Sequence, residues 1–383
     1  MQPTGIVENA KAVNPLVDLL KFGQSVWLDY IRRDLITTGE LKRLIDEDGL
    51  RGMTSNPTIF EKAISGSNDY SDLLKSLKEK ANLDAKARFE ALEIRDIQDA
   101  ADILRSVFVS TKGRDGYVSI EVSPYLARDT QGTISEARAL WKAVNRENIM
   151  VKVPGTVEGL PAFQQLISEG ININVTLLFA QDMYQKIAEA YIAGLEQLAV
   201  KGGNIAKMAS VASFFISRID SAADSVINDK LKQSKDPKEQ ELLKGLLGKV
   251  AIANGKLAYQ RYLKIFSGDR WSKLAAQGAQ TQRVLWASTG TKNPNYSDVM
   301  YVDDLIGPDT VNTIPPSTLD AFRDHGRPHA TLTENVPAAE QTMQSLAKAG
   351  ISIDQITDKL TDDGIRLFEE AFDKLLEAIK KNS

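Results

Sequence analysis

One lysine, Lys152, interrupts a short apolar segment that ends at a Pro-Gly pair. The segment reads Met150-Val-Lys-Val-Pro-Gly-Thr156, and its β-branched residues are typical of a buried strand. A buried ammonium group loses hydration, which favours a neutral amine that can attack a carbonyl carbon. The segment therefore predicts a lysine that forms a Schiff base. The alternative is an edge strand whose lysine extends its ammonium group into solvent.

Two carboxylates, Asp29 and Glu121, also interrupt apolar segments, where an ionised side chain is costly without partners. They are candidates for acid/base work beside the lysine. Asn174 and Thr176 are two residues apart, so they project from the same face of one predicted strand. Further polar candidates follow other apolar segments: Asn56, Ser213, Arg218 and Ser288.

These candidates also have structural interpretations. Asp29 could form an ion pair with Arg32 or Arg33. Glu121 could hold Lys152 in its charged form, which would suppress its nucleophilicity. The sequence leaves both alternatives open. Three others have a structural alternative too: Asn56 as a turn residue, Ser213 as a loop residue and Arg218 as a solvated helix residue.

The composition bears on several other kinds of site. The 383 residues include no cysteine, and the two histidines, His325 and His329, form no metal-binding motif, so we expect no metal. A formal net charge of −4 argues against general binding to nucleic acid or anionic membranes. The N-terminal residues lack the pattern of a signal peptide, and no run of about 18 apolar residues occurs. We therefore expect a cytoplasmic protein.

Eight apolar, strand-like segments alternate with helical patterns along the chain. This alternation predicts a (β/α)8 TIM barrel, whose active site lies at the C-terminal ends of its strands. The polar candidates fall at or near those ends, so this fold would bring them together. The predicted strands span residues 26–30, 50–54, 117–122, 149–153, 171–176, 206–211, 284–288 and 310–314.

Two gaps between predicted strands are longer than a barrel unit requires. Residues 60–116 include the helical pattern from Lys86 to Gln98, and residues 219–282 include a charged helical segment. Residues 337–381 predict two amphipathic helices. We expect one domain over residues 1–383, with two helical insertions and a helical C-terminal extension.

Six motifs together resemble the transaldolase family, in the order of that family and with spacings suited to its barrel. The resemblance covers about residues 14–325, and the long form is similar to the larger bacterial branch of the family. The motifs are Trp27-Leu-Asp29, Thr54-Ser-Asn-Pro-Thr-Ile-Phe60, Val118-Ser-Ile-Glu-Val-Ser-Pro124, Val151-Lys-Val-Pro-Gly-Thr156, Asn174-Val-Thr-Leu-Leu-Phe179 and Ser213-Phe-Phe-Ile-Ser-Arg218.

The resemblance implies an enzyme of the non-oxidative pentose phosphate pathway that works without metal or cofactor. It would transfer a dihydroxyacetone unit from fructose 6-phosphate or sedoheptulose 7-phosphate to an aldose phosphate. Lys152 would form the imine, and Asp29 would move the proton of the C4 hydroxyl. Glu121 and Thr176 would handle water and protons during imine formation. The substrate-binding residues that it implies are Asn56, Asn174, Ser213, Arg218 and Ser288.

One departure from the family pattern concerns the phosphate end of the site. Some branches carry an arginine just after strand 7, but residues 287–294 contain none. Lys292 is a candidate replacement, although Ser288 and backbone amides are an alternative. Two other functions stay open: an aldolase that releases free dihydroxyacetone, and a catalytically silent barrel that serves as an interaction module. Sugar phosphates are the expected ligands, and self-association is left open.

Overall fold

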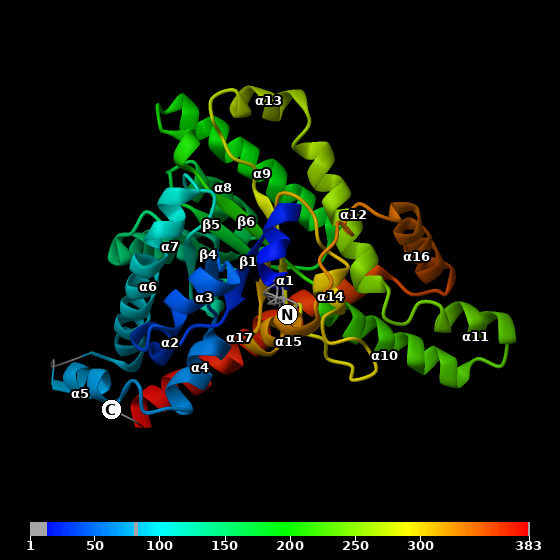
Figure 1. Cartoon of the computed structure of the whole chain (residues 1–383), viewed down its shortest axis with the longest axis horizontal. Helices are drawn as coiled ribbons and strands as arrows, with labels where there is room; N and C mark the ends of the chain where they lie inside the picture. Colours follow the sequence, from blue (N-terminus) through cyan, green and yellow to red (C-terminus); the bar gives the residue numbers. More distant parts are fainter. Residues whose placement is uncertain (1–13, 80–82, 382–383) are drawn as a thin grey trace, which may run out of the picture.

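Eight parallel strands close into a barrel in chain order, which confirms the predicted (β/α)8 fold (Figure 1). The computed structural model describes residues 14–79 and 83–381. The strands are β1 (Gln24–Asp29), β2 (Gly52–Thr54), β3 (Tyr117–Glu121), β4 (Ile149–Pro154), β5 (Ile173–Leu178), β6 (Ser210–Phe215), β7 (Arg283–Ala287) and β8 (Thr310–Ile314).

Strand β6 differs most from the sequence prediction. It begins at Ser210 rather than at residue 206, so the predicted range was wrong. Residues Ile205–Lys207 instead form a 3-10 turn, in which the Asn204 side chain accepts a hydrogen bond from the Ala206 amide at 3.1 Å. The shift places Ser213 inside the strand instead of after it.

Helices follow the strands and cover the outside of the barrel (Figure 1). Those up to β4 are α1 (Pro15–Asp18), α2 (Arg33–Thr37), α3 (Glu40–Asp48), α4 (Pro57–Ser65), α5 (Ser71–Glu79), α6 (Ala85–Ser110) and α7 (Thr130–Val144). Those between β4 and β7 are α8 (Gly159–Ile167), α9 (Gln181–Val200), α10 (Ser217–Gln233), α11 (Pro237–Lys244), α12 (Val250–Ile265) and α13 (Asp269–Ala275). Those after β7 are α14 (Met300–Asp303), α15 (Pro316–His325), α16 (Val336–Lys348) and α17 (Ile353–Lys381).

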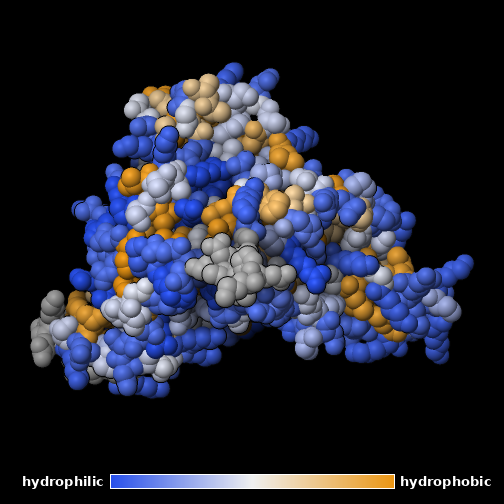
Figure 2. All heavy atoms as spheres, viewed as in Figure 1, coloured by the Kyte–Doolittle hydropathy of each residue, from blue (hydrophilic) through white to orange (hydrophobic). Residues whose placement is uncertain are grey.

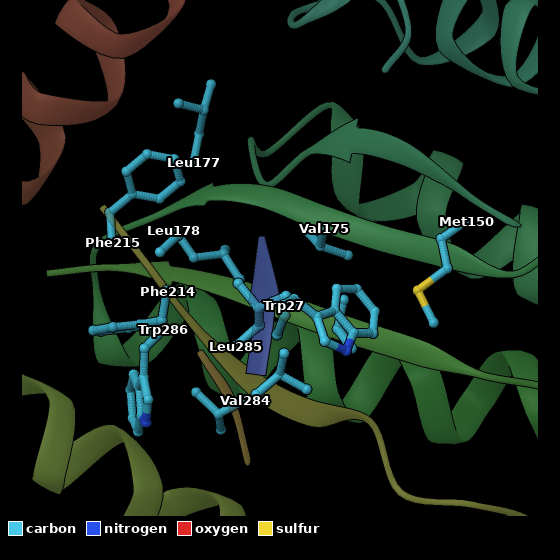
Figure 3. Packing of buried hydrophobic residues seen from close by; sticks show 14 of the residues in the cluster. Trp27, Met150, Val175, Leu177, Leu178, Phe214, Phe215, Val284, Leu285 and Trp286 are labelled. Carbon is cyan, nitrogen blue, oxygen red and sulfur yellow. The ribbon is translucent and has the colours of Figure 1, made fainter. Parts of the chain in front are cut away.

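The core lies around the strands, where large side chains are fully buried (Figure 3). Phe214 on β6 packs edge-on against Trp286 on β7 and against Tyr184 on α9, with ring centroids 6.3 Å apart in both pairs. Burial of each such side chain contributes roughly 1.5–3 kcal/mol to the free energy of folding. This packing fixes the strands that carry the site.

A buried polar network closes the N-terminal end of the barrel. The Arg283 guanidinium pairs with the Asp115 carboxylate at 2.8 Å and donates a second bond to the Ser25 hydroxyl at 2.8 Å. The Trp27 indole also donates to Asp115, at 3.2 Å. A buried charge needs such partners, so these hydrogen bonds stabilise the N-terminal end of the barrel. The polar cavity described below lies at the C-terminal end.

Helix α17 runs beside the C-terminal face of the barrel, where it contacts α4, α6, α10 and β5 (Figure 1). Gly364 permits this approach, because a Cβ atom there would lie 2.9 Å from Leu177 Cδ2 and 3.8 Å from Arg218 Nη1. The C-terminal extension therefore covers part of the barrel mouth. The face shown in Figure 2 is mostly hydrophilic, with scattered apolar patches. Within the described ranges, no helix has the length and apolar character to cross a membrane.

Candidate active site

A cavity of about 520 Å³ lies among the C-terminal ends of the strands. It is the place where the barrel brings sequence-distant polar side chains together. Glu121 and Asn174 are the predicted site residues that do not line it. The predicted residues that do are Asp29, Asn56, Lys152, Thr176, Ser213, Arg218, Ser288 and Lys292.

Lys152 lies on β4, between β3 and β5 of the closed barrel, and is only 4% exposed. The solvated edge-strand alternative is therefore wrong. Its Nζ atom donates a hydrogen bond to the Ser55 carbonyl at 3.0 Å. The same atom lies 3.2 Å from Glu121 Oε2. Lys152 thus has an acid/base partner within hydrogen-bonding distance.

Glu121 reaches the lysine because the two are register partners on adjacent strands. Its side chain is 9% exposed. Burial raises the pKa of Glu121, and the positive charge of Lys152 opposes this rise. A carboxyl group with a raised pKa, placed beside an amine, can accept a proton and return it.

Asp29 ends β1 and faces the cavity beside Thr54, its register partner on β2. The Thr54 hydroxyl donates a hydrogen bond to Asp29 Oδ1 at 2.7 Å, and the Thr54 and Thr313 hydroxyl oxygens are also 2.7 Å apart. Burial raises the pKa of Asp29, while Lys152 and the Thr54 hydrogen bond lower it. The carboxyl is therefore oriented by its neighbours and suited to act as a base.

The structural alternative for Asp29 does not hold. Arg32 pairs with Asp69 at 2.8 Å, and Arg33 pairs with Asp96, also at 2.8 Å. Both arginines are thus engaged by other carboxylates, and the partner of Asp29 is a hydroxyl group inside the barrel.

Asn174 is fully buried below the cavity wall. Its amide nitrogen donates to the Ser119 hydroxyl at 3.1 Å, and its oxygen accepts from the Ser213 hydroxyl at 2.7 Å. The structure therefore places Asn174 behind Ser213, which does reach the cavity. Thr176 lines the cavity directly, and its buried hydroxyl has no hydrogen-bond partner among the described residues.

Asn56 has a structural role at the start of helix α4, as the alternative interpretation of this residue before Pro57 predicted. Its Oδ1 atom accepts a hydrogen bond from the Ile59 amide at 3.0 Å and so caps helix α4. The residue lines the cavity as well, so capping and substrate contact are compatible.

Positive charge gathers at the β6–β7 side of the cavity. The Arg218 guanidinium carbon lies 5.3 Å from the centroid of the Phe215 ring, a cation–π arrangement that orients the arginine. Lys292, on the loop after β7, lines the same cavity. Ser288 adopts a left-handed conformation with φ of 56°, and its hydroxyl lies 3.0 Å from that of Ser217. This side of the cavity is suited to an anionic group.

Several cavity residues were not assigned a role from the sequence. Thr54 and Thr313 form the hydrogen-bonded support of Asp29, and Lys62 adds a cation from α4. Thr54 belongs to a recognised motif and could have been found there. Phe368 comes from α17 and reaches the cavity only through the fold. Among the described residues, no three carboxylate or histidine side chains are grouped as metal ligands.

The sequence of the chain matches a known family. The model for "Transaldolase/Fructose-6-phosphate aldolase" matches residues 26–379. The chain belongs to this family. It is thus an enzyme of the transaldolase/fructose-6-phosphate aldolase family, as the sequence motifs predicted.

Named relatives agree with this membership. The chain is 50% identical over 371 residues to "Transaldolase" of Trichodesmium erythraeum, covering 96% of this chain and 97% of the relative. It is 47% identical over 373 residues to "Transaldolase 2" of Nostoc punctiforme, with coverage of 96% and 97%. It is 46% identical over 367 residues to "Transaldolase" of Thiobacillus denitrificans, with coverage of 96% and 100%.

Proposed function

We propose that the protein is a transaldolase that uses Lys152 as its Schiff-base residue. It transfers a dihydroxyacetone unit from fructose 6-phosphate or sedoheptulose 7-phosphate to an aldose phosphate, glyceraldehyde 3-phosphate or erythrose 4-phosphate, in the non-oxidative pentose phosphate pathway. The observation that carries this proposal is the buried Lys152 Nζ atom, 3.2 Å from Glu121 Oε2, at a cavity that also holds Asp29 and Arg218.

Imine formation begins when Glu121 takes a proton from the Lys152 ammonium group. The neutral amine attacks the ketose carbonyl carbon, and the resulting carbinolamine loses its hydroxyl as water when Glu121 returns the proton. Thr176 would hydrogen-bond this water, since its hydroxyl has no partner among the described residues and lines the same cavity as Lys152. The product is a protonated imine that can accept an electron pair.

Carbon–carbon cleavage follows when Asp29 takes the proton of the C4 hydroxyl. The electrons of the C3–C4 bond move into the protonated imine and form an enamine, and the aldehyde phosphate leaves. The reverse steps join the enamine to the acceptor aldehyde. Arg218 and Lys292 would hold the substrate phosphate, while Asn56, Ser213 and Ser288 would contact substrate oxygens directly. Asn174 would act on the substrate indirectly, because its side-chain oxygen accepts a hydrogen bond from the Ser213 hydroxyl and so orients that serine.

The nearest alternative is an aldolase that releases free dihydroxyacetone, since the family includes both activities. A glutamate at position 121 supports transfer, because the family pattern associates this acid with transaldolases. A silent interaction module is less well supported. Such a module has no need for Asp29, Glu121 and Lys152 on three barrel strands, where each charge carries a desolvation cost.

The cytoplasm remains our expectation for where the enzyme acts. Its proposed substrates are phosphorylated sugars, and charged groups cross a membrane only at a high cost in free energy. Self-association of the chain stays an open expectation.

The test is borohydride reduction in the presence of fructose 6-phosphate, followed by peptide mass mapping. Reduction converts the imine into a stable secondary amine, so we expect a dihydroxyacetone adduct on the peptide that contains Lys152. Addition of erythrose 4-phosphate before reduction should then discharge the adduct and yield sedoheptulose 7-phosphate. An unmodified Lys152 in folded protein would contradict the mechanism, and release of free dihydroxyacetone without transfer would favour the aldolase.

A further inference from the structure

Helix α6 buries a carboxyl group that the proposed chemistry does not use. Glu93 is only 4% exposed, and no described residue donates a hydrogen bond to its side chain. A buried polar group without a partner lowers stability. Its position on the barrel-facing side of α6 therefore calls for a reason other than packing.

Glu93 and Glu121 line the same small cavity. This cavity has a volume of about 20 Å³, enough for one water molecule. Its other walls include the apolar side chains of Phe89, Leu140 and Phe372. Neither glutamate lines the larger substrate cavity, and the small cavity that they share is bounded by residues of helices α6 and α7.

The charged groups around Glu93 favour its neutral form. Glu121 faces it from β3 and Glu136 from α7, while Glu90 and Asp96 flank it on α6. The nearby cation, Lys86, pairs with Glu136 at 3.0 Å and with Glu90 at 3.2 Å. Burial first, and then these carboxylates, raise the pKa of Glu93 well above its usual value. A neutral carboxyl group is a hydrogen-bond donor, which an ionised one is not.

We propose that Glu93 is a positioning residue that donates a hydrogen bond to the Glu121 carboxylate through a water molecule in their shared cavity. This inference rests on the proposed function, because Glu121 is the group it acts on. A hydrogen bond to the charged form of Glu121 favours that form against the effect of burial. Glu121 then stays ready to take the ammonium proton of Lys152 and to return it to the departing hydroxyl. Glu93 itself keeps its proton throughout.

Two substitutions test this role. In E93L the donor is lost, while leucine suits the apolar walls, so we expect a melting temperature at or above that of the wild type. In E93Q a neutral donor is retained. The measurement is the pH profile of the borohydride trapping rate with fructose 6-phosphate. The control is E61Q on α4, because Glu61 does not line the small cavity.

We expect the acid limb of the E93L profile to move upward by about one pH unit, with trapping about tenfold slower on that limb. The E93Q and E61Q profiles should match the wild type. An E93L profile that matches the wild type would overturn the inference, as would an E93Q profile shifted like that of E93L. Failure of the wild type to be trapped at Lys152 would instead overturn the proposed function.

Infrared spectroscopy gives a second readout that does not depend on turnover or on the folding of E93L. The wild type at neutral pH should show the carbonyl stretch of a protonated carboxylic acid, and E93Q should lack it. If the wild type and E93Q have the same absorbance in this carbonyl region, Glu93 is ionised and the inference is wrong.

Discussion

Glu121 Oε2 lies 3.2 Å from Lys152 Nζ because the two residues are register partners on β3 and β4. In the proposed mechanism, this pairing lets Glu121 accept the proton of the ammonium group and later donate it for dehydration. Substitution of Glu121 by glutamine keeps the shape of the side chain and removes its ability to exchange a proton. We expect imine formation to slow by about 10²–10⁴-fold. The measurement is the single-turnover rate of borohydride trapping at saturating fructose 6-phosphate.

A matched control is E61Q, on α4, whose carboxylate bonds its own helix at Ser65. That variant should trap at the wild-type rate. Trapping by E121Q at the wild-type rate would show that Glu121 only pairs with Lys152.

Asp29 should act after the imine has formed. In D29N the amine can still attack, but the C4 hydroxyl loses its base, so cleavage should slow by about 10²–10⁴-fold. Borohydride should then trap the intact six-carbon phosphate on the Lys152 peptide instead of a three-carbon unit, and the adduct mass distinguishes the two. D34N, a nearby change at a carboxylate paired with Arg32, should give the three-carbon adduct. A three-carbon adduct formed at the normal rate in D29N would remove Asp29 from the cleavage step.

Lys292 and Arg218 should affect only phosphorylated substrates. Loss of one charge-assisted contact to a phosphate costs about 1.5–3 kcal/mol, so K292Q and R218Q should each raise KM for fructose 6-phosphate by about tenfold or more. Neither should change the trapping of unphosphorylated dihydroxyacetone by the same factor. The comparison is steady-state kinetics with both compounds, with K21Q as a control at an exposed lysine paired with Asp18. Equal losses for both compounds would indicate damage to the lysine environment instead of lost phosphate binding.

Asp220 lies outside the substrate cavity, and it should make the free energy of unfolding depend on pH. Its carboxylate accepts hydrogen bonds from the Ala251 amide at 2.7 Å and from the Tyr301 hydroxyl at 2.9 Å, yet burial raises its pKa to about 6. Between about pH 4 and pH 6, the folded state therefore holds a proton that the unfolded state has released. The free energy of unfolding should fall by about 3 kcal/mol as the pH rises through this window.

Substitution of Asp220 by asparagine should remove this dependence. Urea unfolding of the wild type and D220N, at about pH 4 and about pH 6.5, measures the difference between the two slopes. If both proteins lose stability equally over this range, Asp220 is not the group responsible.

Most of the predicted residues that line the cavity could be found from local sequence. Lys152 and Glu121 stand out because each carries a charge within an apolar strand, and that contrast is visible without any tertiary information. The position of Glu93 relative to Glu121 gave no such signal. Glu93 lies in the apolar stripe of its helix with Phe89 and Ile97, which indicates burial, but nothing local indicates that Glu121 lies across the same small cavity.

The sequence by itself determined the number and order of the strands and the fold class, because alternation between strand and helix is a local property of hydrophobic patterning. Only the tertiary structure decided where strand β6 begins, which partner Asp29 has, and that Asn174 lies behind Ser213. It also decided that α17 brings Phe368 to the cavity. These features depend on packing between segments far apart in the chain, and the free energy of such contacts is not encoded in any short window of sequence.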